Sequence, residues 1–202
     1  AMLYYHLWRK GRITEEELNS YCQDGSKFIG LCEAVVPEIK IAGGSMGLGL
    51  PGAVGIAMAK KLRNEEGRVF VLMSDGEMQC GTTWESALIA AQHKLNNLVV
   101  LIDNNGLQAM GKTRDILDIG YPAFVFRGWA GLTIDDGHNY RLIEICLEIK
   151  KQEDVEDMPL VLQCNTIKGK GVSFMENNNL WHYAQIKEDD YQKALVELSC
   201  VK

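Results

Sequence analysis

The sequence lacks the features that mark several classes of protein. No apolar run is long enough to span a bilayer, and no charged segment followed by an apolar one opens the chain, so we expect no membrane association and no secretory leader. Basic residues are scattered, and the net charge of −6 argues against nucleic acid as a partner. The 202 residues also contain no internal repeat and no low-complexity tail.

The six cysteines lack any spacing typical of a metal site, since there is no Cys-x-x-Cys pair and no Cys/His pattern. Most of them lie in apolar runs, which favours reduced thiols and predicts a cytoplasmic location. A chain of this length is large enough to form one α/β domain with its own core, so we expect a single domain over residues 1–202.

The most informative stretch runs from Val69 to Gly106. Its pattern predicts a strand, a turn carrying Ser-Asp-Gly-Glu, a crossover helix over residues 80–94 and a second strand over residues 97–102. Strands this apolar are typical of a parallel sheet that is buried on both faces, so we predict an open, mostly parallel α/β sheet with helices on both faces. Such sheets bind their ligands beyond the carboxyl ends of the strands.

The two strand ends in this stretch carry complementary polar groups. Asp75 precedes Gly76, where a ligand can approach the backbone closely, and the second strand ends in Asn104 and Asn105. Carboxylate, amide and carbonyl oxygens on converging turns suit Mg²⁺ or Ca²⁺, and Mg²⁺ leaves positions for phosphate oxygens. The backbone N–H groups of Gly76 and Glu77 are placed to meet an anionic diphosphate. Either turn alone is equally compatible with an ordinary βα connection.

The glycine-rich segment 43–52 admits two interpretations. Gly47 to Gly52 satisfies the Gly-x-Gly-x-x-Gly pattern of a dinucleotide site, and Asp75 ends the next strand. The preceding strand is weak, however, and that interpretation leaves the Asp-Asn-Asn turn without a role. The alternative is close packing, in which small residues line a helix that lies tight on its neighbour: Gly52, Ala53, Gly55, Ala57 and Ala59.

The rest of the chain predicts continued alternation of helices and strands. Near the N-terminus we expect a helix over residues 1–11 and a helix to about residue 23 that begins in a capping box of Thr14 and Glu17. The later expected elements are a short strand at 37–41, a helix at 121–129, a strand near Leu132, a helix at 139–151, an apolar strand at 159–164 and a terminal helix at 188–198. A long loop rich in Gly, Asn and Lys lies between the last two, and a loop of this length usually carries function.

Three histidines can serve either chemistry or structure. His6 is interpreted as a packing residue, and His138, in Asp-Gly-His-Asn, as a turn or capping residue. His182, beside Trp181 in the long loop, can titrate near neutral pH or hydrogen-bond a phosphate. Composition alone favours a structural role for His182 as well.

Together these motifs resemble a known family. Asp75-Gly followed by Asn105 resembles the thiamine diphosphate motif. Within that superfamily the chain is similar to the N-terminal, diphosphate-binding subunit of split transketolases. The similarity extends through GGSMGLGLPGAVGIAMAKKL from residue 43, DGHN from residue 136 and TIKGKGVSFMENNNLWH from residue 166. It covers nearly the whole chain in order and implies the thiamine diphosphate-binding fold of the diphosphate (PP) domain.

The resemblance also implies a set of site residues. Mg²⁺, which Ca²⁺ or Mn²⁺ can replace, is expected on Asp75, Asn105 and the backbone carbonyl of Leu107. His182 is the implied catalytic residue, reaching the diphosphate and the substrate. The expected contacts to thiamine diphosphate are Gly44, Met46, Asp75, Gly76, Glu77, Asn105, Ala109 and His182. Of these, Met46 is expected against the thiamine rings and Ala109 near the pyrimidine.

The implied activity is transfer of a two-carbon ketol unit from a ketose or ketose phosphate to an aldehyde, with the cofactor as the electron sink. A transketolase also needs a pyrimidine-binding domain, and the family usually carries a further N-terminal segment with histidines that contact phosphate and substrate. We therefore expect a chain that is inactive alone and that works with a C-terminal, pyrimidine-binding subunit in a heteromer, most simply a heterotetramer.

Four positions depart from the family pattern. Ser74 replaces a usual glycine, Leu31 falls where a His-Pro pair is common, Cys80 replaces a frequent interface glutamate, and Tyr183 replaces glycine. They favour a transketolase with a specialised substrate. Two alternatives stay open: another thiamine diphosphate enzyme, similar to deoxyxylulose-phosphate synthase or a 2-oxo-acid dehydrogenase, and a non-catalytic relative that keeps the fold as a structural subunit.

Overall fold

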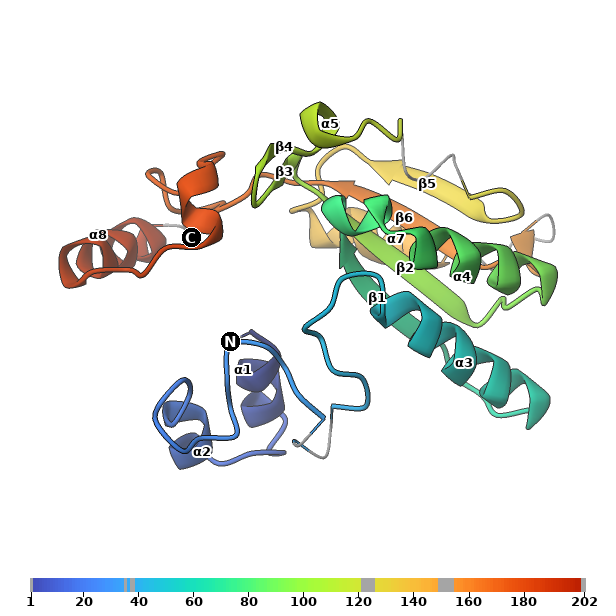
Figure 1. Ribbon diagram of the computed structural model, residues 1–202, viewed down its shortest axis with the longest axis horizontal. Coiled ribbons are helices and arrows are strands. Elements are labelled where there is room, and N and C mark those ends of the chain that lie inside the picture. Colours follow the sequence, from blue (N-terminus) through green and yellow to red (C-terminus); the bar gives the residue numbers. More distant parts are fainter. Residues whose placement is uncertain (1, 35, 37–38, 121–125, 149–154, 201–202) are drawn as a thin grey trace.

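A four-stranded parallel sheet carries the main hydrophobic core of the protein and lies on the right in Figure 1. The computed structural model describes residues 2–34, 36, 39–120, 126–148 and 155–200. The strands lie in the order β1-β2-β6-β5, with β1 at Val69–Ser74, β2 at Leu98–Asn104, β6 at Leu160–Asn165 and β5 at Ala130–Ile134. All three pairings are parallel, which confirms the predicted sheet.

The strand register places polar residues together at one edge of the sheet. Ser74 of β1 lies opposite Asp103 of β2. Asn104 of β2 in turn lies opposite Asn165 of β6. Because parallel strands end on the same side, the carboxyl ends of these three strands form one continuous polar rim.

Helices cover both faces of the sheet, as the sequence predicts. On one face α3 (Gly49–Leu62) and α4 (Gly81–Gln92) pack over alternate strand residues that include Val71, Val100 and Val161. On the other face α7 (Tyr140–Glu148) packs through Ile143 and other residues over the intervening positions, which include Val99, Leu160 and Leu162. The alternation follows from the two-residue period of a strand.

Three aromatic residues fix α4 to the rest of the core. Trp84 lies within α4 and donates from its indole nitrogen to the carbonyl of Met78 (2.8 Å), while Trp129 donates to the carbonyl of Ala87 (3.0 Å). Phe126 lies between the two indoles, with ring centroids 5.5 Å and 5.2 Å away. Trp84 is therefore a partly buried residue that packs against the core, broadly as its helical spacing indicates, and each indole N–H has a hydrogen-bond partner.

The N-terminal residues build a smaller cluster of their own, seen apart from the sheet in Figure 1. Helix α1 (Met2–Arg9) and helix α2 (Glu15–Asn19) enclose the buried ring of Tyr4. The predicted capping box is present, since Thr14 Oγ1 accepts from the N–H of Glu17 (3.1 Å) and Glu17 Oε2 accepts from the N–H of Thr14 (3.0 Å). Helix α2 ends earlier than residue 23. His6 is exposed and lies outside this buried cluster, so it is not a core packing residue, although its ring makes a T-shaped contact with the neighbouring Tyr5 ring.

The glycine-rich segment does not form a dinucleotide-binding turn. That motif requires a strand directly before the glycines, and residues 39–48 contain none. The close-packing interpretation is correct for part of α3, because a Cβ on Gly52 would lie 2.4 Å from the side chain of Ile41. It is wrong for Gly55, where a Cβ would meet nothing within 4 Å.

Several smaller elements differ from the sequence predictions. Residues 39–41 of the predicted strand at 37–41 form no strand, and residues 37–38 lie outside the described residues. Of the predicted helix at 121–129, residues 121–125 lie outside the described residues and 126–129 form a turn. The elements not predicted are the 3₁₀ turns η1 (Gly76–Gln79) and η4 (Asn179–His182), the hairpin of β3 (Leu107–Gln108) and β4 (Gly111–Lys112), and α5 (Thr113–Ile116).

The last described element is α8 (Glu188–Ser199), which matches the predicted terminal helix. It follows the long loop after β6 and lies away from the sheet in Figure 1. Among the described residues, no helix combines the length and the apolar character needed to cross a membrane.

Candidate functional site

Asp75 is a buried carboxylate at the end of β1, with only 3% of its surface exposed. Its Oδ1 accepts from the N–H of Gly76 (2.9 Å), and its Oδ2 accepts from the N–H of Gly106 (2.9 Å) and the hydroxyl of Thr113 (2.9 Å). A carboxylate offers about four lone-pair sites, so these bonds leave room for about one more partner. Burial raises the pKa of the Asp75 carboxyl above its ordinary value, although the three hydrogen bonds act to lower it.

The turn that Asp75 contacts contains the other two predicted metal ligands. Gly106, whose N–H bonds the carboxylate, has a φ of +75°, a backbone conformation that favours glycine. Beside it the side-chain oxygen of Asn105 accepts from the N–H of Leu107 (3.0 Å). A carboxylate, an amide oxygen and a backbone carbonyl therefore belong to two turns that a hydrogen bond joins. These donors suit a hard divalent cation.

A cation at this position would rely mainly on amide and carbonyl oxygens. Within the ranges that the structure describes, no three His, Cys, Asp or Glu side chains gather in a group able to hold a metal ion. A cation with few protein ligands keeps its other positions for water and phosphate oxygens, as Mg²⁺ commonly does.

The glycine-rich segment is fastened to the Asp75 turn through Gly47. The N–H of Gly47 donates to Glu77 Oε1 (2.9 Å), and its carbonyl accepts from Thr82 Oγ1 (2.7 Å). This double attachment holds Gly47 against the turn that follows Asp75, and the exposed Gly44 and Met46 come one to three residues before it. Both residues are thus accessible to a ligand, and the resemblance implies that they contact thiamine diphosphate.

The backbone N–H groups of Gly76 and Glu77 do not stand open for a diphosphate in this structure. The N–H of Gly76 donates to Asp75, and the N–H of Glu77 donates to Ser74 Oγ (3.1 Å). A 3₁₀ turn separates the strand from α4, and local side-chain acceptors use both donors, so a bound diphosphate would have to replace these bonds. The role of Gly76 and Glu77 as cofactor contacts stays a prediction. The substitution of Ser74 for the usual glycine supplies one of the acceptors.

Sequence reasoning missed a polar layer under the rim. Asn165 Oδ1 accepts from Asn104 Nδ2 (2.8 Å) and from Gln163 Nε2 (3.1 Å), and Thr166 Oγ1 donates to Asp103 Oδ1. Gln163 is 2% exposed within β6, so the strand is not apolar throughout. A lone glutamine inside an otherwise apolar strand is the sequence signal for such a layer, because a buried amide must find partners.

His138 connects the loop after β5 with the loop after β6. Its Nε2 accepts from the N–H of Ile167 (2.8 Å), and its own backbone N–H donates to Asp136 Oδ1 (3.1 Å). The interpretation of His138 as a turn residue is confirmed, and the turn has the additional task of holding the start of the long loop. Gly137 beside it allows no side chain, since a Cβ would lie 2.8 Å from the carbonyl oxygen of Asn165.

The long loop reaches the β3–β4 hairpin at Asn179. Its Nδ2 donates to the carbonyl of Ala109 (3.1 Å), whereas its Oδ1 is buried without a hydrogen-bond partner. His182 follows in η4 and is exposed, and Trp181 stacks on Phe174 with ring centroids 5.3 Å apart. Ala109 and His182 thus lie on connected segments, and no hydrogen bond of the His182 side chain is found within the described residues.

The other departures from the family pattern lie at distinct places. Leu31 is 56% exposed in the N-terminal part, and Tyr183 is 98% exposed beside His182. Cys80 lies at the start of α4, next to Gly47. Burial raises the pKa of the Cys80 thiol and the charge of Glu77 adds to the rise, so the thiol stays protonated at neutral pH.

Two clefts flank the rim on either side of the Asn104–Gly106 turn. The larger, of about 620 Å³, extends from this turn to the segment that includes Lys112 and Arg114. The other, of about 570 Å³, extends toward Asp135 at the end of β5. Clefts at the carboxyl edge of an open parallel sheet define the coenzyme-binding class of α/β proteins.

Comparison with known proteins identifies the family. The family described as "Transketolase, thiamine diphosphate binding domain" matches residues 1–199, and the chain belongs to it. An apulose-4-phosphate transketolase subunit of Actinobacillus succinogenes is 36% identical over 203 residues, which cover 96% of this chain and 70% of that protein. The protein of the same name from Phocaeicola vulgatus is 34% identical over 202 residues, covering 98% and 70%.

A solved structure agrees with this assignment. The crystal structure of transketolase from Campylobacter jejuni superimposes with a TM-score of 0.82 at 29% identity and covers 91% of this chain. This chain spans only 30% of that longer protein, against about 70% of the two relatives that are named as subunits.

Proposed function

We propose that this chain is the diphosphate-binding subunit of a thiamine diphosphate-dependent transketolase. It would transfer a two-carbon ketol unit from a ketose phosphate to an aldehyde acceptor. The observation that carries the proposal is the buried Asp75 carboxylate, which is hydrogen-bonded to the Asn105–Leu107 turn and retains an open lone-pair site. The family to which the chain belongs binds the cofactor, and both relatives are named transketolases.

Asp75, Asn105 and the Leu107 carbonyl are proposed to hold Mg²⁺, or Ca²⁺ or Mn²⁺ in its place. The donor set fits, because the three groups are hard oxygen ligands on adjoining turns. A buried, negatively charged Asp75 has no cationic partner among its hydrogen bonds, and a divalent cation would supply one. The same cation would neutralise a diphosphate brought into the site.

The chain's own residues would position the cofactor and exclude water. Met46, which is 61% exposed, offers an apolar surface for the thiamine rings, and the Gly47–Glu77 hydrogen bond keeps it in place. Ala109 is proposed to lie near the pyrimidine, and Asn179 ties the long loop to it. His182 would approach the diphosphate and substrate from that loop. When bound, the cofactor supplies the electron sink for the two-carbon transfer.

A partner chain is part of the proposal. The two relatives are each named as one subunit of a transketolase. These names support a second subunit, which would provide the pyrimidine-binding part of the enzyme in a heterotetramer.

The location and the substrate are also part of the proposal. All six cysteines are free thiols, which supports a cytoplasmic location. Leu31 and Tyr183 support a substrate that differs from that of a general transketolase. Leu31 is apolar where the family has a hydrogen-bond donor to the substrate, and Tyr183 is bulky where the family has glycine, which would narrow the site.

The proposed function is tested by a donor screen on the chain mixed with its pyrimidine-binding partner, thiamine diphosphate and Mg²⁺. We expect two-carbon transfer from ketose phosphates, no reaction with pyruvate, and no transfer when either of the two chains is assayed without the other. Full activity of the 202-residue chain alone would contradict the need for a partner. A preference for pyruvate would instead indicate an enzyme similar to deoxyxylulose-phosphate synthase or a 2-oxo-acid dehydrogenase.

The raised pKa of Asp75 predicts a pH dependence of cofactor binding. A proton and a divalent cation compete for the carboxylate, so binding should weaken as the pH falls through this raised pKa, at a higher pH than for an exposed aspartate. The folded-state pKa lies above the unfolded value. The stability that this group contributes is therefore present at low pH and lost as the pH rises through the folded-state pKa.

Calorimetric titration with thiamine diphosphate and Mg²⁺ at a series of pH values measures this effect, and thermal unfolding of the cofactor-free chain measures the opposite trend in stability. An affinity that stays constant from neutral pH down through the range in which an exposed aspartate titrates would show that Asp75 is not the group that binds the cation.

A further inference from the structure

Two cations line the larger cleft, and the proposed function does not yet use them. Lys112 and Arg114 line the cleft together with the Asn104–Leu107 turn, and the remaining charged residue of the lining is Asp118. The lining therefore carries a net charge of +1 (two cations and one anion) in a chain whose net charge is −6. A local reversal of sign in a cleft concentrates an anionic ligand there.

The residue between the two cations fixes the backbone that carries them. Thr113 is 8% exposed, and its hydroxyl donates to Asp75 (2.9 Å). Its N–H donates to the carbonyl of Gly106 (3.0 Å), and its own carbonyl accepts from Gln79 Nε2 (3.0 Å). The backbone that presents Lys112 and Arg114 is thus held by the same carboxylate that is proposed to bind the cation.

The two cations differ in how far a neighbouring carboxylate neutralises their charge. Lys112 is exposed, lies opposite Leu107 in the β3–β4 hairpin, and forms no ion pair within the described part of the chain. Arg114 makes one contact, from Nη2 to Asp118 Oδ2 (3.4 Å), between side chains that are 76% and 54% exposed. An exposed pair of this kind is weak, and the guanidinium keeps further N–H donors free. Asp118 is itself held by the N–H of Gly120 (2.9 Å).

We propose that Lys112 and Arg114 bind a phosphoryl group of the ligand that occupies this cleft. The inference rests on the proposed function and extends it, because it assigns two residues that recognise the phosphate. The group is either the diphosphate of the cofactor or the phosphate of the sugar substrate. A smaller cavity of about 70 Å³, lined by Asp75, Thr113 and Arg114 among others, adjoins the buried carboxylate. Arg114 therefore lines both the cleft and the surroundings of the metal site.

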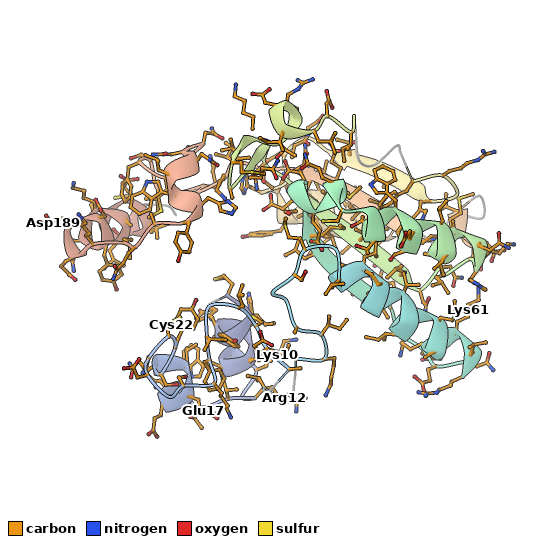
Figure 2. All side chains as sticks on the ribbon, in the orientation of Figure 1. Lys10, Arg12, Glu17, Cys22, Lys61 and Asp189 are labelled. Atoms are coloured by element: carbon orange, nitrogen blue, oxygen red, sulfur yellow. The ribbon has the colours of Figure 1, made fainter. Side chains whose placement is uncertain are left out.

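Three variants and one matched control test the proposal. Lys112→Met and Arg114→Gln each remove one cation, and Asp118→Asn removes the anion that competes for Arg114. Lys10→Met removes an exposed cation from the N-terminal part, where Figure 2 labels it away from the cleft. All four side chains are exposed, so the variants should fold, and thermal unfolding checks this.

Two measurements separate the two sources of phosphate. The first is calorimetric binding of thiamine diphosphate, and of inorganic diphosphate, to the full chain with Mg²⁺. The second is the KM of the chain with its partner subunit for a ketose phosphate and for the same ketose without phosphate. We expect Lys112→Met and Arg114→Gln each to weaken either the affinity for the two diphosphate ligands or the apparent affinity (1/KM) for the ketose phosphate by about tenfold. Asp118→Asn should strengthen the same affinity by about threefold. Lys10→Met should change neither.

A loss confined to the two diphosphate ligands assigns the pair to the cofactor, and a rise in KM confined to the phosphorylated ketose assigns it to the substrate. Either result supports the proposal. Unchanged affinities and KM values in both cation variants, while the unaltered chain binds thiamine diphosphate, would overturn it and leave the proposed function intact. Failure of the unaltered chain to bind thiamine diphosphate would overturn the proposed function instead, and inorganic diphosphate would still test the cation pair.

Discussion

Replacing Asp75 by alanine is expected to weaken Mg²⁺-dependent binding of thiamine diphosphate by roughly a hundredfold or more. The variant loses the only buried carboxylate among the described residues of the site, and with it the proposed metal ligand. It also leaves the N–H of Gly106 and the hydroxyl of Thr113 without their acceptor. Since Thr113 fixes α5 and the hairpin, the cleft itself should loosen.

Calorimetry with thiamine diphosphate and Mg²⁺ measures this loss, and thermal unfolding shows whether the variant remains folded. Each orphaned donor costs about 1–3 kcal/mol, but removal of a buried charge offsets part of that cost, so we expect a folded protein. Asp189→Ala is the matched control, because Asp189 is an exposed carboxylate on α8, away from the sheet in Figure 2. Near-normal affinity in Asp75→Ala would remove the basis of the metal site.

Replacing Gly47 by alanine is expected to destabilise the protein by about 2–4 kcal/mol and to abolish cofactor binding. Gly47 has a φ of +82°, and a Cβ at this position would lie 2.4 Å from Thr82 Oγ1 and 2.7 Å from Cys80 Cβ. To relieve the clash the segment must move away from α4. That movement breaks the hydrogen bonds that fasten it to Glu77 and Thr82, so Met46 would leave the site.

Gly55→Ala provides the control for this prediction. Gly55 lies inside α3, where a Cβ would meet nothing within 4 Å, so alanine should stabilise the helix by up to about 1 kcal/mol. Chemical denaturation of both variants gives the two changes in unfolding free energy, and calorimetry gives the cofactor affinity. Equal effects of the two substitutions would mean that the close contact at Gly47 has no role in the site.

The main features of the sheet could be predicted because they depend on local pattern. The apolar runs of β1 and β2, the helix between them and the polar residues after each strand determine where a parallel sheet places its ligand edge. That topology places Asp75 next to the Asn105 turn, and the hydrogen bond from the N–H of Gly106 to the Asp75 carboxylate joins the two.

The contacts that complete the site depend on residues far apart in the sequence. Thr113 and Gln79 carry no motif of their own, and their roles appear only when α5 folds back onto η1. Gln163 is recognisable as unusual within an apolar strand, and its contact with Asn165 is local, but the hydrogen bond from Asn104 to Asn165 requires the register of β2 against β6. The acceptors of the Gly76 and Glu77 N–H groups were not predicted for a related reason, because the choice between a 3₁₀ turn and a regular helix start rests on individual side-chain acceptors.

The order of the strands constrains how the chain folds. Strand β5 is synthesised before β6, yet among the described residues β6 is the one strand it pairs with. Strand β2 obtains its second neighbour from residues about sixty positions later. Such non-local pairings slow folding, because the chain loses the entropy of closing a long loop before the stabilising contacts form. During synthesis the inner edge of β2 therefore stays unpaired until β6 has emerged, and the nascent chain is most exposed to misassociation during that interval.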